Sequence, residues 1–203
     1  MGVGSKYCRR AYPIPKNIKK NIAVDIGANI GGFSNAYHDK FEKIIFFEAN
    51  PTTFKIASNN TSSLKNVIGY NLAVSDKSGK TLKLMSHFSN DLGSVSCSPS
   101  VIDINKDWTE RIGEVQTISL EDILEMINGE RINFLKLDCE NSEYEILMGK
   151  DLSKIDYIAM EIHCQMGENK YKNLLNHLSN FFKINGKLKY NKNENSLLYC
   201  HKL

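Results

Sequence analysis

The chain has 203 residues, of which 41% are hydrophobic and 24% charged, and its formal net charge is +3. This composition is typical of one soluble globular domain and argues against a disordered chain. No apolar run reaches the length of a membrane-spanning helix and no secretory signal opens the sequence, so we expect a cytoplasmic protein with no membrane partner.

The first segment of the chain differs from the rest in charge. Residues 1–20 hold six basic residues and no acid, which leaves residues 21–203 mildly acidic. We therefore predict a basic N-terminal arm over 1–20 and a single domain over 21–203. Such an arm could dock an anionic substrate, but a solvated tail is the favoured interpretation. The five scattered cysteines form no CxxC pair, which predicts reduced thiols.

A predicted βαβ unit follows between residues 22 and 51. The apolar runs 22–26 and 44–47 each predict a buried strand, and a glycine-containing loop and a helix-like stretch lie between them. An acid, Glu48, ends the second strand, where it can accept hydrogen bonds from both hydroxyls of a ribose. A strand, glycine turn, helix and second strand with a terminal acid indicate a nucleotide-binding unit.

The loop of this unit is not typical of a dinucleotide site. Asn29 stands where the G-x-G-x-x-G motif has its second glycine. Asp25 lies two residues before the first glycine, Gly27, and a carboxylate there would repel a pyrophosphate. It suits a ligand with a cationic end, such as S-adenosylmethionine, which has an ammonium and a sulfonium but no phosphate. The alternative is a plain glycine turn in an unspecialised α/β protein, which Glu48 disfavours.

Strands and helices alternate along the remaining chain. Further strands are predicted at 67–73, 81–85, 115–120, 132–137, 155–162, 184–190 and 197–201. Helices are predicted at 52–60, 120–128, 142–148 and 171–182. We expect the strand at 81–85 to pair in a hairpin with the strand before it. Residues 86–113 lack periodicity, and a connection of this length predicts a mobile lid or a binding loop.

The order of these elements predicts the fold class. Alternation of strands and helices favours an α/β fold with a mostly parallel sheet and helices on both faces. The last two predicted strands form a hairpin around 191–195, which would insert one antiparallel strand.

Six segments of the chain together resemble a known family. In order they are VDIGANIGGFS, FFEANP, NLAVSD, GSVS, LKLDCENSEYEIL and IAMEIH. This set, which runs from about residue 21 to about residue 163, resembles the FkbM family of S-adenosylmethionine-dependent methyltransferases. The resemblance implies a Rossmann-like, seven-stranded sheet with an antiparallel last strand, and methyl transfer, most often to an oxygen of a sugar or natural product. The family usually has glycine where this chain has Asn141, which tolerates left-handed backbone angles better than most residues.

The expected position of S-adenosylmethionine follows from the strand ends, because ligands of open α/β sheets lie across the carboxyl ends of the strands. Gly27 and Asn29 should border its methionine half, Glu48 its ribose, and the segment 71–73 its adenine. The predicted cofactor-binding residues are Asp25, Gly27, Ala28, Asn29, Gly31, Glu48, Ala49, Asn50, Asn71, Ala73 and Asp138.

Methyl transfer to a hydroxyl also needs a group that takes up the proton. The predicted catalytic residues are Asp138, nearest the methyl group, with Glu161 and His163. Glu140 is a further candidate base, and a structural role is the alternative for His163. No tight ligand spacing calls for a metal, so none is predicted.

We expect a hydroxyl of a sugar, glycan or small natural product as the acceptor. The alternatives are an RNA methyltransferase and a non-catalytic cofactor-binding module. The slightly acidic body and the lack of an aromatic and basic stripe disfavour a nucleic-acid partner.

Overall fold

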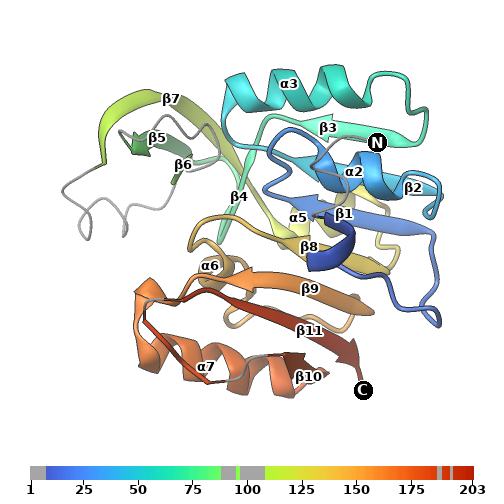
Figure 1. Cartoon of the computed structure of the whole chain (residues 1–203), viewed down its shortest axis with the longest axis vertical. Coiled ribbons are helices and arrows are strands. Elements are labelled where there is room, and N and C mark those ends of the chain that lie inside the picture. The colour runs from blue at the N-terminus through green and yellow to red at the C-terminus, as the bar shows by residue number, and fades with distance from the viewer. Residues whose placement is uncertain (1–7, 88–94, 97–107, 187–188, 193) are drawn as a thin grey trace.

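The main sheet of the protein has seven strands in the order β10-β11-β9-β8-β1-β2-β3 (Figure 1). The computed structural model describes residues 8–87, 95–96, 108–186, 189–192 and 194–203. The strands of this sheet are β1 (Ile22–Ile26), β2 (Lys43–Phe47), β3 (Val67–Tyr70), β8 (Phe134–Leu137), β9 (Tyr157–Ile162), β10 (Phe182–Gly186) and β11 (Ser196–Lys202). β11 is antiparallel to both neighbours, and the other pairs are parallel. The predicted seven-stranded sheet with an antiparallel last strand is confirmed.

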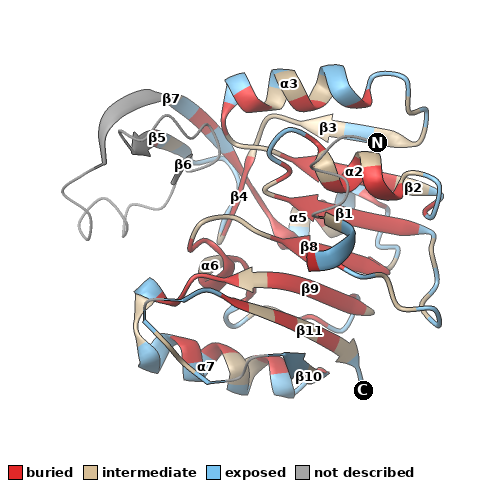
Figure 2. Cartoon of the chain, viewed as in Figure 1, coloured by how far each residue is buried: buried red, intermediate tan, exposed pale blue. Residues whose placement is uncertain are grey.

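Helices cover both faces of this sheet, as predicted. They are α2 (Gly32–Tyr37), α3 (Pro51–Thr61), α5 (Leu120–Met126), α6 (Glu143–Leu147) and α7 (Glu168–Ser179), with a short 3₁₀ turn at Cys164–Met166. Successive residues of β1 point to opposite faces. Val24 belongs to the buried cluster that includes Ile146 of α6, whereas Ala23 belongs to the cluster that includes Phe33 of α2. Figure 2 shows that the central strands are buried along most of their length.

A second, four-stranded sheet extends from one side of the main sheet (Figure 1). Its strands are β4 (Ala73–Ser75), β5 (Thr81–His87), β6 (Val95–Ser96) and β7 (Trp108–Ser119), in the order β4-β7-β5-β6. β4 is parallel to β7, and β5 is antiparallel to both β7 and β6. The sequence did not predict this sheet.

Two predicted strand assignments are wrong in this region. The strand predicted at 67–73 is two strands in different sheets, because the chain leaves the main sheet after Tyr70. The side-chain amide of Asn71 donates hydrogen bonds to the carbonyls of Glu48 and Ala49, at 2.8 and 3.0 Å, and so fixes this break. The strand at 81–85 pairs with β7 and β6 rather than with the strand before it.

The segment predicted to be an irregular lid is partly regular. Residues 86–87 end β5, residues 95–96 form β6, and residues 108–113 begin β7. The remaining parts of the expected lid, 88–94 and 97–107, lie outside the described residues.

The described part of the N-terminal segment packs against the domain. Residues 8–11 form a helical turn, and Ala11 and Tyr12 are buried, so a solvated tail is the wrong interpretation for these two residues. The hydroxyl of Tyr37 donates to the Tyr12 carbonyl at 2.8 Å, and that of Tyr199 donates to the Ala11 carbonyl at 2.9 Å. Among the helices that can be described, none combines the length and the apolar character needed to span a membrane.

Candidate functional site

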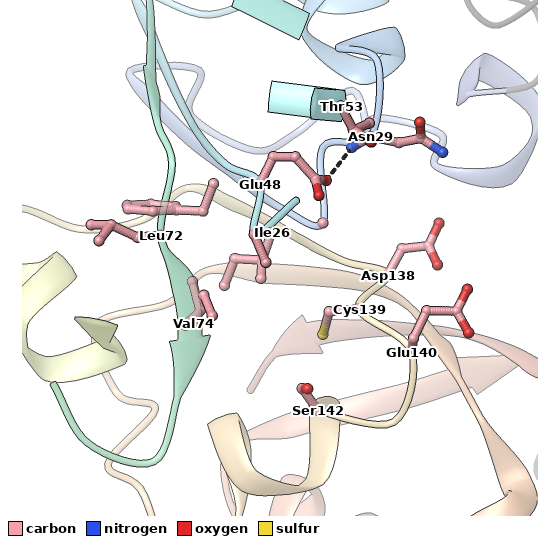
Figure 3. A pocket seen from close by; sticks show the side chains of 14 residues that line it. Ile26, Asn29, Glu48, Thr53, Leu72, Val74, Asp138, Cys139, Glu140 and Ser142 are labelled. Carbon is pink, nitrogen blue, oxygen red and sulfur yellow. Dashed lines mark hydrogen bonds between the residues drawn. The ribbon is translucent and has the colours of Figure 1, made fainter. Parts of the chain in front are cut away.

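A pocket lies at the carboxyl ends of β1, β2 and β8, beside the start of β4 (Figure 3). Gly27, Glu48 and Asp138 each directly follow one of these three strands. The residues that line the pocket are Ile26, Gly27, Asn29, Phe47, Glu48, Ala49, Thr53, Leu72, Ala73, Val74, Asp138, Cys139, Glu140 and Ser142. This edge of the sheet is where ligands of open α/β folds bind.

The carboxylate of Glu48 is held by two backbone donors. Its Oε2 accepts a hydrogen bond from the amide of Asn29 at 2.8 Å, and its Oε1 accepts one from the amide of Asn50 at 2.9 Å. Burial raises the pKa of Glu48, and the two amides oppose this shift. A carboxylate oxygen can accept more than one hydrogen bond, so each can still accept one from a ligand hydroxyl.

Gly27 allows the loop after β1 to lie directly against the end of β8. Its φ is +74°, and a Cβ placed there would lie 1.8 Å from the backbone oxygen of Asp138. The amides of Gly27 and Ala28 both donate to the carbonyl of Phe47, at 3.0 and 3.1 Å. A side chain at position 27 would therefore separate the loop from Asp138. The positive φ and the close backbone contact both require glycine at this position.

Asp25 has a different place from the one expected, because it is buried and does not line the pocket. It is the cross-strand partner of Lys136 on β8, and its Oδ1 lies 3.0 Å from the Lys136 ammonium. Lys136 also donates to the carbonyl of Gly27 at 2.6 Å. Burial alone would lower the pKa of Lys136, but the charges of Asp25 and Asp138 raise it. The pair thus fixes the glycine loop from beneath.

The predicted cofactor-binding residues divide into two groups. Those that line the pocket are Gly27, Asn29, Glu48, Ala49, Ala73 and Asp138. Those that do not are Asp25, Ala28, Gly31, Asn50 and Asn71. Asn50 instead caps α3, since its side chain accepts a hydrogen bond from the amide of Thr52 at 2.9 Å. Gly31, with a φ of +82°, precedes α2 as its N-cap.

One wall of the pocket is apolar. Sequence reasoning did not identify Ile26, Phe47, Thr53, Val74, Cys139 and Ser142 as lining residues. Ile26 and Phe47 are the last residues of their strands and directly precede Gly27 and Glu48. This position in the sequence could have predicted that they line the pocket. Figure 3 shows Leu72 and Val74 on one side of Glu48, and Asp138 and Glu140 on the other. The pocket is therefore apolar at one end and acidic at the other.

The acidic end is built on the turn after β8. Glu140 and Asn141 have positive φ values of 51° and 78°, so Asn141 adopts the left-handed geometry for which glycine is usual. The Tyr12 hydroxyl donates to Oδ2 of Asp138 at 2.8 Å. Burial raises the pKa of Glu140, and the nearby His163 opposes this shift.

His163 is buried between two carboxylates and does not line the pocket. Its Nδ1 lies 3.0 Å from Oε1 of the fully buried Glu143, and its Nε2 lies 3.4 Å from Oε2 of Glu140. Burial alone would lower the pKa of His163, but these carboxylates raise it to about 9. Glu161, the other predicted catalytic residue, also lies outside the lining set and accepts a hydrogen bond from Asn195 at 2.9 Å.

The raised pKa of His163 predicts a pH-dependent stability. Its stabilising contribution is complete below pH 6.5, the ordinary pKa of histidine, and is lost as the pH rises through about 9. Between these values the free energy of unfolding should fall by on the order of 2–3 kcal/mol more in the wild type than in His163→Gln. Urea unfolding at several pH values measures this, and an equal fall in both proteins would contradict the charge assignment.

The residues of the pocket fit a nucleoside with a cationic group. Among the lining residues, Glu48, Asp138 and Glu140 are acidic and none is Lys or Arg. The Thr53 hydroxyl is buried with no hydrogen-bond partner among the described residues, so it is available to a polar ligand. Within the described ranges, no three His, Cys, Asp or Glu side chains are grouped so as to hold a metal ion.

The chain is similar to two known methyltransferases. The hexuronic acid methyltransferase AglP of Haloferax volcanii is 28% identical over 148 residues, which are 70% of this chain and 56% of AglP. The crystal structure of the methyltransferase FkbM from Methylobacillus flagellatus KT superposes with a TM-score of 0.60 at 16% identity, over 98% of this chain and 48% of that one. The chain thus spans about half the length of these relatives, and the structural likeness supports the Rossmann-like methyltransferase fold.

The family model described as a methyltransferase FkbM domain matches residues 25–191. This match begins near the end of β1 and includes β2, the acid Glu48, and the turn after β8 with Asp138 and Glu140. Because it covers well over half of the sequence, the chain belongs to the methyltransferase FkbM domain family.

Proposed function

We propose that this chain carries an S-adenosylmethionine-dependent O-methyltransferase activity towards a hydroxyl of a sugar or glycan. The observation that carries the proposal is Glu48, a carboxylate anchored by two backbone amides in a pocket whose lining holds no basic residue. Such a pocket suits a ribose and a cationic group and disfavours a phosphate.

Each part of the pocket has a proposed role in binding S-adenosylmethionine. Glu48 accepts hydrogen bonds from the ribose hydroxyls, and the apolar wall with Leu72 and Val74 covers the adenine. The acidic end, with Asp138 and Glu140, faces the methionine half. When bound, S-adenosylmethionine would supply an electrophilic methyl group, and its sulfonium sulfur would keep the electron pair of the broken bond.

The proton of the acceptor hydroxyl needs a base at the acidic end. Asp138 and Glu140 are the candidates, because both line the pocket. His163 is a poor base at neutral pH, since its raised pKa keeps it protonated. Its proposed role is to hold Glu140 through the contact of 3.4 Å. Glu161 is proposed to act only indirectly, on acceptor binding.

A sugar acceptor is favoured by the relative AglP, whose name describes a hexuronic acid methyltransferase. The test is transfer of radiolabelled methyl groups from S-adenosylmethionine to a panel of hexuronic acid glycosides, other glycosides, nucleotide sugars and RNA oligomers. Each productive sugar is repeated as its deoxy analogue, which should accept no label. Labelled RNA without any labelled sugar product would replace this proposal with an RNA methyltransferase.

A further inference from the structure

A residue of the N-terminal segment reaches the acidic end of the pocket. The hydroxyl of Tyr12 donates a hydrogen bond of 2.8 Å to Oδ2 of Asp138, a residue 126 positions later in the chain. Tyr12 is only 1% exposed and Asp138 is half-buried, so this hydrogen bond is partly sheltered from water. A hydrogen bond to a charged group is stronger than one between neutral groups.

The position of Tyr12 is fixed from several sides. Its own carbonyl accepts a hydrogen bond from Tyr37 at 2.8 Å, and the preceding carbonyl, that of Ala11, accepts one from Tyr199 at 2.9 Å. The ammonium of Lys136 lies 5.5 Å from the centre of the Tyr12 ring, within the range of a cation–π contact. The hydroxyl is therefore presented to Asp138 by a rigid backbone and a packed ring.

The contact leaves one side of the Asp138 carboxylate for a ligand. Tyr12 engages Oδ2, and within the described part of the chain no hydrogen bond to Oδ1 is found. Asp138 lines the pocket and is half-buried, so its Oδ1 can accept a hydrogen bond from a bound molecule. A donor on one oxygen restricts rotation of the carboxylate.

We propose that Tyr12 is a positioning residue of the methyl-transfer site, which orients the Asp138 carboxylate towards the acceptor. This inference rests on the proposed function, and it makes residues 8–12 part of the active site. The aromatic ring alone would account for the packing of Tyr12, so the hydroxyl is the group whose role is tested.

The test compares two variants that each remove one tyrosine hydroxyl. Tyr12→Phe keeps the ring and loses the hydrogen bond to Asp138, whereas Tyr199→Phe loses an anchor of the same segment without touching Asp138. With the sugar acceptor, Tyr12→Phe should lower kcat about 5- to 20-fold, as expected for a hydrogen bond to a charged group. Tyr199→Phe should change kcat by less than about twofold.

A double-mutant cycle with Asp138→Asn separates this role from simple packing. In the Asp138→Asn background, Tyr12→Phe should have little further effect on kcat. Both proteins then lack the carboxylate that the Tyr12 hydroxyl orients. Independent effects of the two substitutions on kcat, or equal losses in Tyr12→Phe and Tyr199→Phe, would overturn the proposal.

The same cycle in urea unfolding needs no acceptor. We expect Tyr12 and Asp138 to be coupled by at least about a fivefold change in the unfolding equilibrium constant. If no acceptor of the panel is methylated, the proposed function fails, and this coupling alone then decides whether Tyr12 holds Asp138. Additive effects on unfolding would show that it does not.

Discussion

Glu48→Ala is expected to weaken the binding of S-adenosylhomocysteine by roughly 2–4 kcal/mol, about 30- to 1000-fold, while the protein stays folded. The carboxylate is the proposed partner of the ribose hydroxyls. It also accepts the amide hydrogen bonds of Asn29 and Asn50, so its loss removes both a ligand contact and a support of the loop. Isothermal titration calorimetry gives the affinity, and thermal unfolding checks the fold.

The matched control for this prediction is Glu42→Ala. Glu42 is an exposed acid just before the other end of β2, so its removal changes the net charge equally without touching the pocket. Its affinity should equal that of the wild type within about twofold. A folded Glu48→Ala protein with unchanged affinity would remove Glu48 from the binding site.

Asp138→Asn is expected to lower turnover by at least about 100-fold, with a smaller loss of cofactor affinity. The substitution keeps the shape of the side chain but removes the charge that would take up or orient the acceptor proton. Rates of methyl transfer at saturating S-adenosylmethionine, together with calorimetry, separate the two effects.

Glu161→Gln serves as the comparison for Asp138→Asn. It makes the same chemical change at a carboxylate outside the pocket lining, which contacts Asn195. Its loss of turnover should be smaller and partly expressed as a higher KM for the acceptor. Similar losses of turnover in both variants would contradict a direct role of Asp138 in methyl transfer.

The central part of the fold could be predicted from the sequence, because local patterns determine it. The runs that became β1 and β2 are short, apolar and separated by a glycine loop, and such a unit forms a parallel pair with few alternatives. Glu48 and Asp138 directly follow parallel strands, and the carboxyl ends of parallel strands lie at one edge of the sheet. The predicted strand ends were therefore enough to place both residues at that edge.

Other features depend on contacts that local patterns do not contain. The apolar run 67–73 has the sequence pattern of a single strand. The chain leaves the main sheet at Asn71, whose side chain forms hydrogen bonds with the carbonyls of Glu48 and Ala49. Asp25 was expected at the ligand because a carboxylate near the glycine loop suits a ligand with a cationic end. The register of β1 against β8 provides that partner, Lys136, from a distant part of the sequence.

Long-range contacts also explain what the sequence pattern did not show at the acidic end. Tyr12 lies in a segment whose basic composition favours a solvated tail, yet its hydroxyl reaches Asp138. His163 was a candidate base because free histidine titrates near neutral pH. Its place between Glu140 and Glu143 raises its pKa to about 9, which supports the proposed role of holding Glu140.

The most direct test of the central claim is a crystal structure of the protein with S-adenosylhomocysteine. We expect the ligand in the pocket at the carboxyl ends of β1, β2 and β8. Its ribose hydroxyls should be within hydrogen-bond distance of Glu48, its adenine against Leu72 and Val74, and its amino-acid end towards Asp138. A ligand bound elsewhere on the protein, or in this pocket with its ribose away from Glu48, would contradict it.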